Sequence, residues 1–463
     1  MRVAFWLLQD SIQQWSNWIA GLYYVQHCLE ALTLLPNADV PKVFVFLPES
    51  LREKFVESEA CGAASWLTIV PIAERLLQDN AGLKQLENLV ASYDCDVFFP
   101  VMTPPIIPVA GKTIAWITDY QHKHYPDFFA ADDLAYRDKL FSFLTCIADR
   151  VVCSSEVVQS DLERYYPLAK DRSFVLRFTV QPPAKALAGD IRRSLEKFHI
   201  GSPYAYLPYQ FWSHKNHRVA FEAWRILKER GLSFTLVCSG AKKDSRNLEH
   251  FQSLENYLRE HQLEDSIRIL GIVDRHDQWQ LYRGAKLVLQ PSLFEGWSTS
   301  VEEARSLGKA IVLSDIPIHR EQLSEGGYFF PARDSEHLAT TVEDLWTKLP
   351  EGHQPDLESQ AVAAQSGRVQ AFGLQLLKLF QATLAEEREP IASQILPLFT
   401  FFQNEAKARL AVIEALSARS DSKGTLGRMK GSPESSEPLP KDQSDLRRGL
   451  ARARAWAARV FHL

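Results

Sequence analysis

Two carboxylates eight residues apart, Glu295 and Glu303, frame the segment of this chain whose residue types best suit chemistry. An apolar run ends at Pro291, a loop follows, and the pattern then predicts a helix that begins near Thr299. A helix start presents unpaired N–H groups and a positive dipole end, which together favour a phosphate or diphosphate. The small residues that let a ligand approach the backbone there are Gly296, Ser298, Thr299 and Ser300. Carboxylates beside such a site accept hydrogen bonds from neutral hydroxyls, so the segment predicts a site for a phosphorylated compound that carries sugar or ribose hydroxyls.

The same residues also fit a purely structural interpretation. Thr299 is followed three residues later by Glu302, and Ser300 by Glu303, which is the pattern of a capping box. In that case the acids only cap the helix. The local pattern leaves both interpretations open.

A second candidate, Lys215, lies in the polar loop of segment 206–224, which follows another apolar run. A lysine ahead of a helix is a mobile point charge suited to a diphosphate. The alternative is a solvated surface lysine, the usual state of this residue type. His214 and His217 have the spacing of a metal-binding pair, but no carboxylate or cysteine accompanies them, and a usable site needs three or four ligands. We therefore predict no metal site here.

A third cluster, Asp119, His122 and His124, lies in segment 115–129 after a further apolar run. A histidine at this place can hold a sugar hydroxyl or support charge that develops at a reacting carbon. We take His122 as a catalytic candidate and Asp119 as a substrate-binding one. The alternative is one buried structural histidine and one exposed histidine.

The elements that must position these residues are short apolar runs that alternate with helical segments. The runs of a first series are 3–8, 42–47, 66–70, 96–101, 113–118, 150–155 and 173–178, and those of a second are 204–209, 233–239, 266–271, 286–292, 309–315 and 328–330. Such near-continuous apolar strands indicate parallel sheets that are covered on both faces. Because ligands bind beyond the carboxyl ends of these strands, we expect two doubly wound α/β domains that face each other across an active-site cleft.

The domain boundaries follow from the same pattern. We predict an N-terminal Rossmann-like domain at 1–178, on the acceptor side, a linker at 179–200 and a second Rossmann-like domain at 201–365. A crossover helix region at 366–388 and an extra helix at 389–417 follow. Residues 418–445 lack aromatics and are rich in Ser, Gly, Pro and charge, which predicts a flexible tether. Residues 446–463 predict a basic amphipathic helix that docks on an anionic membrane surface or on a protein.

Composition limits the function classes. The 463 residues are 46% hydrophobic and 24% charged, as in soluble globular proteins, and the formal net charge is −5. Nucleic acid is therefore not expected as the main partner. The six cysteines form no CxxC pair, and Cys153 and Cys238 fall in strand-like runs, where a thiol is usually a small buried hydrophobe. With no signal peptide recognised, we expect a cytoplasmic protein, peripheral at the inner face of a membrane if the tail binds there.

The three segments together resemble a retaining glycosyltransferase of family four, which has the two-Rossmann (GT-B) fold. The paired-acid signature of that family is matched by Phe294-Glu295-Gly296-Trp297, Glu303-Ala304 and Gly308-Lys309-Ala310-Ile311. The resemblance extends from about residue 2 to residue 386.

The resemblance implies a role for each candidate. Glu295 would contact the hydroxyls of the donor sugar, Glu303 the nucleotide ribose and Lys215 the diphosphate. The loop at Ile272 and Val273 would hold the nucleobase through main-chain contacts. The main-chain N–H groups expected to join Lys215 at the diphosphate are those of Trp297, Ser298 and Thr299, and Gly296 is expected to contact the substrate.

Three departures from the family pattern stand out. The family often has Arg five residues before the lysine, and here that position is Gln210, which donates hydrogen bonds but no charge. The surrounding Gln-Phe-Trp block resembles a subset of the family, so Gln210 is expected to bind substrate. The Gly-Gly pair after the first strand is Ala20-Gly21, and we expect Gly21 to contact substrate. The tether and basic helix have no counterpart in the minimal family architecture.

The resulting prediction is a hexosyltransferase that moves a sugar from a nucleotide-diphosphate sugar to a hydroxyl of a glycan, lipid-linked or small-molecule acceptor. The resemblance implies front-face attack with retention and without a covalent enzyme intermediate. No metal or other cofactor is expected, because Lys215 and the helix dipole supply positive charge. Two alternatives stay open: another two-Rossmann enzyme, such as a sugar-nucleotide epimerase or a phosphorylase, and a non-catalytic interaction protein on the same fold.

Overall fold

The computed structural model describes residues 1–8, 20–56, 64–77, 79–103, 107, 109–244 and 246–387. The predicted extra helix at 389–417, the tether and the basic helix at 446–463 lie outside these residues. Within them, no helix is long and apolar enough to cross a membrane.

The first domain is built on a seven-stranded parallel sheet of order β3-β2-β1-β4-β5-β6-β7. Its strands are β1 (Arg2–Trp6), β2 (Lys42–Pro48), β3 (Leu67–Ile72), β4 (Val97–Val101), β5 (Lys112–Ile117), β6 (Arg150–Cys153) and β7 (Ser173–Val175). The central strands β4 and β5 are buried along their whole length, as their continuous apolar runs predict. The order reverses between β1 and β4, which creates the crevice where doubly wound sheets bind ligands.

The second domain has a six-stranded parallel sheet of order β10-β9-β8-β11-β12-β13. Its strands are β8 (Tyr204–Leu207), β9 (Thr235–Cys238), β10 (Ile267–Ile269), β11 (Leu287–Gln290), β12 (Ile311–Ser314) and β13 (Gly327–Phe330). Here the order reverses between β8 and β11, the two strands that precede the predicted lysine and acid loops. The prediction of two doubly wound parallel sheets is confirmed.

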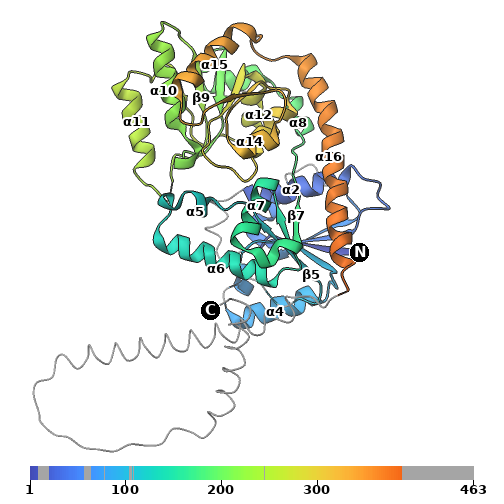
Figure 1. Cartoon of the computed structure of the whole chain (residues 1–463). Coiled ribbons are helices and arrows are strands. Elements are labelled where there is room, and N and C mark those ends of the chain that lie inside the picture. Colours follow the sequence, from blue (N-terminus) through green and yellow to red (C-terminus); the bar gives the residue numbers. More distant parts are fainter. Residues whose placement is uncertain are drawn as a thin grey trace, which may run out of the picture. The chain divides into compact units, whose positions relative to one another are not determined.

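The helices connect these parallel strands (Figure 1). Those of the first domain are α2 (Ala20–Thr33), α3 (Arg52–Val56), α4 (Asn80–Ala91), α5 (Gln121–His124), α6 (Ala131–Ile147) and α7 (Glu156–Tyr165). Those that follow are α8 (Ala184–Leu187), α9 (Ile191–Lys197), α10 (His217–Glu229), α11 (His250–Glu260), α12 (Arg275–Gly284), α13 (Thr299–Ser306), α14 (Pro317–Gln322), α15 (Ser335–Lys348) and α16 (Pro355–Leu384). Short 3-10 turns include η6 (Ser213–Lys215), which carries the candidate lysine.

Two connections differ in detail from the sequence prediction. The predicted linker at 179–200 contains the short helices α8 and α9. The helix expected at 366–388 begins at Pro355, because proline at the first helical position is favourable and its missing N–H costs nothing there. Helix α16 then crosses from α13 of the second domain to α2 of the first (Figure 1). Its Phe380 ring packs edge-on against Phe5 and Phe99 of the first sheet, which joins the two domains through a shared core.

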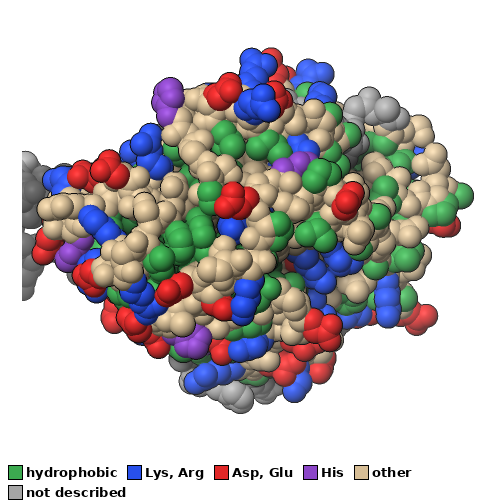
Figure 2. All heavy atoms as spheres, turned by 90° about the horizontal axis from the view of Figure 1, so that it is seen from above, with side chains coloured by type: hydrophobic (Ala, Val, Ile, Leu, Met, Phe, Trp, Pro, Cys, Tyr) green, Lys and Arg blue, Asp and Glu red, His purple; other side chains and the backbone are tan. Residues whose placement is uncertain are grey.

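The face seen in Figure 2 carries acidic and basic side chains interspersed with hydrophobic ones. This mixture matches the small formal net charge of −5. The described cysteines are free, and Cys153 and Cys238 are fully buried in β6 and β9, as predicted for small core residues.

Candidate active site

The three predicted segments lie at the carboxyl ends of β5, β8 and β11, and the first and third meet directly. A Cβ placed on Gly296 would lie 2.0 Å from the main-chain oxygen of Thr118, so only glycine permits this approach of the two domains. The Trp297 indole Nε1 donates a hydrogen bond to the Phe178 oxygen at 2.9 Å, and the Tyr125 hydroxyl donates to the Leu293 oxygen at 3.2 Å. In this structure the absence of a side chain at Gly296 therefore allows close contact with the main chain of the first domain at Thr118, whereas the sequence analysis expected a ligand there.

Lys215 and Glu295 form an ion pair with 2.6 Å between Nζ and Oε1. Their side chains are only 14% and 9% exposed, and the lysine Nζ lies 5.2 Å from the centre of the buried Tyr209 ring. The alternative of a solvated surface lysine is therefore wrong. The fold brings the predicted diphosphate cation and the predicted sugar-binding acid into one contact.

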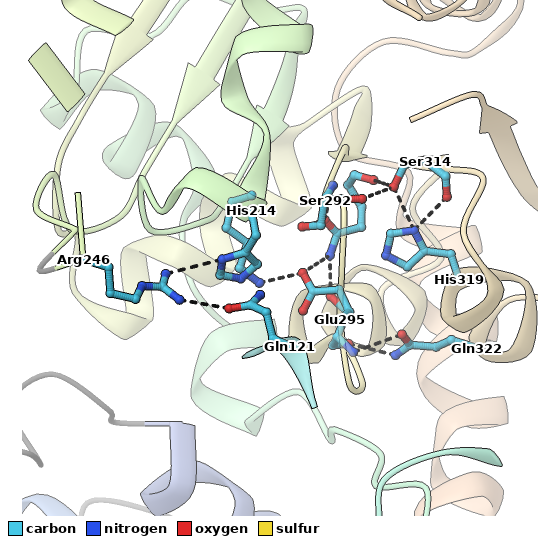
Figure 3. A network of polar contacts seen from close by, with 11 residues as sticks. Gln121, His214, Arg246, Ser292, Glu295, Ser314, His319 and Gln322 are labelled. Carbon is cyan, nitrogen blue, oxygen red and sulfur yellow. Dashed lines mark hydrogen bonds and ion pairs between the residues drawn. The ribbon is translucent and has the colours of Figure 1, made fainter. Parts of the chain in front are cut away.

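Two glutamines fix the acid loop in place (Figure 3). Gln290, the last residue of β11, donates from Nε2 to Ser298 Oγ at 2.6 Å and reaches Glu295 Oε1 at 3.4 Å. Gln322 of α14 accepts from the Ser298 N–H at 3.1 Å and donates to the Ser298 oxygen at 2.8 Å. The Ser298 N–H is thus engaged within the protein in this structure, and its predicted place among the donors to a diphosphate stays a prediction.

The helix start itself excludes the capping-box interpretation. Helix α13 begins at Thr299 with Ser298 as N-cap residue, and no side chain caps it. Neither acid therefore stands at the third helical position that a capping box requires. Glu302 is fully buried and accepts a hydrogen bond from Gln322 Nε2 at 2.9 Å, and burial raises its pKa.

Glu303 is buried and pairs with Arg275, whose guanidinium lies 2.6 Å from its Oε1. Burial opposes the charge on Arg275, but the Glu303 carboxylate outweighs it and raises the pKa of the guanidinium. Arg275 also lies over the rings of Tyr23 from the first domain and Trp279 from its own helix. The sequence analysis missed Arg275; the only signal is its place at the start of a helix directly after the predicted nucleobase loop.

That loop, at Ile272 and Val273, precedes α12. Ile272 is 81% exposed, whereas Val273 packs against the core. Gly271 has a φ of +75°, and its oxygen accepts a hydrogen bond from the Gly240 N–H at 2.8 Å. The turn therefore presents main chain beside Arg275 and so leaves a place for main-chain recognition.

The two histidines of segment 115–129 are both paired with aspartates. His122 is buried, and its Nε2 lies 2.9 Å from Asp138 Oδ1. Burial lowers the pKa of His122, and the hydrogen bond to Asp138 opposes that effect without reversing it. Its Nδ1 has no hydrogen-bond partner in the described part of the chain. His124 Nε2 lies 2.8 Å from Asp161 Oδ2. Because His122 is buried and His124 is exposed, the structural alternative of one buried and one exposed histidine stays open beside the functional one.

Asp119 has a local role as well: its carboxylate accepts a hydrogen bond from the Gln121 N–H at 2.9 Å. Gln121 in turn accepts at its side-chain oxygen from Arg246 of the second domain, also at 2.9 Å (Figure 3). Arg246 reaches His214 Nδ1 at 3.4 Å. This second arginine was also missed by the sequence analysis, and it places a cation next to the turn that carries the candidate lysine.

The remaining candidates are half-buried or buried residues outside the Lys215–Glu295 ion pair. Gln210 is half-buried just beyond β8, and Gly21 is buried in the first turn of α2, directly after the undescribed residues 9–19. His217 is fully buried, stacks on Phe211 at 4.2 Å between ring centres, and has its pKa lowered to about 3 by burial. Burial also lowers the pKa of His214 well below its usual range. Among the described residues, no group of three or more His, Cys, Asp or Glu is arranged to hold a metal ion.

Comparison with known proteins locates these features in a family. Residues 201–356 match the family described as glycosyl transferases group 1. The chain is 24% identical over 237 residues to O-antigen chain mannosyltransferase B of Escherichia coli, a match that covers 48% of this chain and 60% of that protein. The structure of a glycosyltransferase from Rickettsia africae ESF-5 matches with a TM-score of 0.60 and 15% identity, over 83% of this chain and 99% of that one. Anabaena Alr3699/HepE in complex with UDP and glucose matches with a TM-score of 0.53 and 14% identity, over 86% and 99%.

These likenesses fix the fold and the class of the second domain. The two Rossmann-like domains have the GT-B arrangement, as predicted. Residues 201–356, which hold Lys215, Glu295 and Glu303, match the family described as glycosyl transferases group 1, and the predicted class of enzyme, a glycosyltransferase, is confirmed. Membership of family four and retention stay predictions.

Proposed function

We propose that this chain, whose residues 201–356 match the family described as glycosyl transferases group 1, transfers a sugar from a nucleotide-diphosphate sugar to an acceptor hydroxyl with retention. The observation that carries the proposal is the contact between Lys215 and Glu295. A cation suited to a diphosphate and an acid suited to sugar hydroxyls lie 2.6 Å apart, at the carboxyl ends of neighbouring strands and beside the start of α13.

Lys215 supplies the charge for the leaving group. As the bond between sugar and diphosphate breaks, negative charge grows on the diphosphate, and a preorganised ammonium lowers the energy of that state. The positive end of α13 adds to this, although the Ser298 N–H is already bound to Gln322. Donor binding must therefore exchange the carboxylate of Glu295 for phosphate oxygens at Lys215, which frees Glu295 to accept hydrogen bonds from the sugar.

Glu303 and Arg275 form the nucleotide end of the same site. The carboxylate of Glu303 accepts hydrogen bonds from the two ribose hydroxyls. Arg275, paired with it at 2.6 Å, supplies the countercharge for that buried carboxylate. The exposed turn at Ile272 adjoins Arg275 in the chain and offers its main chain to the base.

His122 serves the acceptor side. Its lowered pKa keeps the imidazole neutral near pH 7. In the tautomer whose Nε2–H donates to Asp138, Nδ1 carries a lone pair and has no partner in the described chain. It accepts a hydrogen bond from a hydroxyl at the reacting carbon. Asp119 lies on the same loop and faces Gly296. No group on this chain need form a covalent intermediate, because the departing diphosphate takes the acceptor proton on the front face.

The relatives suggest which substrates to try. A mannosyltransferase for the O-antigen chain and a protein complexed with UDP and glucose favour mannose or glucose as the sugar and a glycan as the acceptor. We propose that turnover needs no divalent metal, since Lys215 and the helix end carry the positive charge. A cytoplasmic location, with association of residues 446–463 to a membrane or a protein, stays a prediction outside the described residues.

The test uses the purified full-length chain with uridine and guanosine diphosphate derivatives of glucose and mannose. Release of nucleoside diphosphate identifies the donor, and proton NMR of the first product reports its anomeric configuration. An α-linked product from an α-configured donor is expected. A β-linked product contradicts retention, and a chain that neither binds nor cleaves any of the donors contradicts the whole proposal.

A further inference from the structure

A cavity of about 440 Å³ lies between α2 of the first domain, the linker around Gln181 and α12 of the second domain. We call it the α2–α12 pocket. Its volume falls within the range of small-molecule sites. Apolar surface comes from Tyr23, Trp279, Pro182 and Pro183. The pocket is not lined by Lys215, Glu295 or His122, the residues with a proposed role at the sugar end of the donor.

Buried polar groups in this lining lack partners. His27 Nε2, Gln181 Oε1 and Trp279 Nε1 are buried without a hydrogen bond in the described part of the chain. His27 is 7% exposed and Trp279 only 1%. Such groups are rare in folded proteins, because each costs the free energy of its lost hydration. These three atoms belong to residues that line one cavity, so hydroxyl groups of a ligand bound there would be in reach of partners that the described chain does not supply.

The charges of the lining favour an anion. Lys54 and Lys185 contribute two cations besides Arg275, which is paired with Glu303, whereas Glu30 is the one acid among the lining residues and lies 2.9 Å from His27 Nδ1. Lys54 and Lys185 are exposed, so they act at the rim. A phosphate or carboxylate group on a ligand would therefore meet a net positive entrance.

We propose that the α2–α12 pocket binds a saccharide that carries a phosphate or carboxylate group. The aromatic and proline rings pack against the apolar face of a pyranose, the amides of Gln26 and Gln181 and the ring of His27 bond its hydroxyls, and the lysines bind its anionic group. Arg275 lines the pocket and also pairs with Glu303, so the ligand would lie beside the nucleotide. If this saccharide is the acceptor of the transfer reaction, that role rests on the proposed function. The binding of the saccharide to the pocket does not depend on it.

The binding test uses the full-length chain without nucleotide. Mannose 6-phosphate and glucuronic acid serve as probes, with methyl α-mannoside and inorganic phosphate as the neutral and sugar-free comparisons. Titration calorimetry and saturation-transfer NMR measure affinity and contact. We expect both acids to bind at least tenfold more tightly than either comparison, and to weaken as salt screens the rim.

Variants then locate the binding. Lys54→Glu with Lys185→Glu should weaken mannose 6-phosphate at least tenfold, and Leu34→Trp at the exposed rim should block it by filling the mouth. Lys348→Glu, an exposed lysine on α15 that does not line the pocket, is the matched control and should change affinity less than twofold.

Three results overturn the proposal. The first is no saturable binding of either acid up to about 20 mM, because a small-molecule site of this size should bind more tightly than that. The second is an affinity that the lining variants leave unchanged, and the third is competitive displacement by UDP and GDP, which would make the pocket part of the donor site. Donor cleavage is measured in parallel. Lost cleavage with intact saccharide binding counts against the proposed function alone, and intact cleavage without saccharide binding counts against this pocket alone.

Discussion

Replacing Lys215 with Ala tests both the chemistry and the packing of the site. The substitution removes the ammonium that is 2.6 Å from Glu295 and leaves that carboxylate, 9% exposed, without its cation. Breaking a buried ion pair typically costs about 3–5 kcal/mol of unfolding free energy. Gln290 Nε2 still reaches Glu295 at 3.4 Å, so we expect the lower end of that range, about 3 kcal/mol.

The catalytic loss should exceed the loss of stability. A preorganised charge on a leaving group is worth on the order of 10²–10³ in kcat. The variant should therefore stay folded, with a melting temperature lowered by several degrees, while kcat falls by that factor. Glu295→Gln and the double variant complete a cycle in which the two stability losses should be less than additive, because both remove one contact.

The assay combines thermal melting with steady-state release of nucleoside diphosphate. Lys228→Ala is the matched control, since this lysine lies on the surface of α10 and contacts main-chain oxygens only. Near-normal kcat in folded Lys215→Ala would refute the assignment of the leaving-group cation. Additive stability losses would show that the ion pair seen in the structure does not form in solution.

Four further outcomes are expected. Glu303→Gln should weaken binding of a nucleoside diphosphate in calorimetry, whereas Glu295→Gln should spare it and impair only the full donor; equal losses would contradict the separate roles. Gly296→Ala should lower kcat and the melting temperature because its Cβ would meet a main-chain oxygen at 2.0 Å, whereas Gly367→Ala in α16, with open space around it, should be neutral or stabilising by about 0.5–1 kcal/mol. Burial lowers the pKa of His217 to about 3, whereas the pKa of an unfolded histidine is about 6.5. Between these two pH values the unfolded chain therefore holds a proton on His217 that the folded chain does not. His217 alone should then contribute a fall of about 2 kcal/mol in unfolding free energy between pH 7 and pH 5, and His217→Gln should reduce the slope seen in melts across that range by this share. Removal of divalent metals with EDTA should leave the rate of donor cleavage unchanged, and recovery only on adding Mg²⁺ or Mn²⁺ would refute the metal-independent proposal.

The sheets were largely readable from the sequence. Each predicted apolar run overlaps an observed strand, because a strand buried on both faces needs apolar residues at every position, and that need leaves a continuous signal. The ends were less accurate: the run predicted at 173–178 forms a strand only over Ser173–Val175. Beyond it the chain leaves the sheet, and the Phe178 oxygen accepts the hydrogen bond from Trp297.

The helix at residue 299 shows where local pattern fails. The sequence around Thr299 permits a capping box, yet the cap falls at Ser298, whose hydroxyl and main chain are held by Gln290 and Gln322. Gln322 is distant in sequence and reaches the loop only because α14 packs beside it. No window of local sequence contains that contact.

The sequence by itself determined the parallel-sheet domains and the presence of Lys215, Glu295 and Glu303 at strand ends, because burial and strand direction act locally along the chain. Only the tertiary structure decided which distant groups these charged side chains pair with. It paired Lys215 with Glu295 across 80 residues, and it brought Arg275 to Glu303 and Arg246 to Gln121. A charged side chain looks the same in sequence whether it is solvated or buried, and its state depends on which distant group supplies the countercharge when water is excluded.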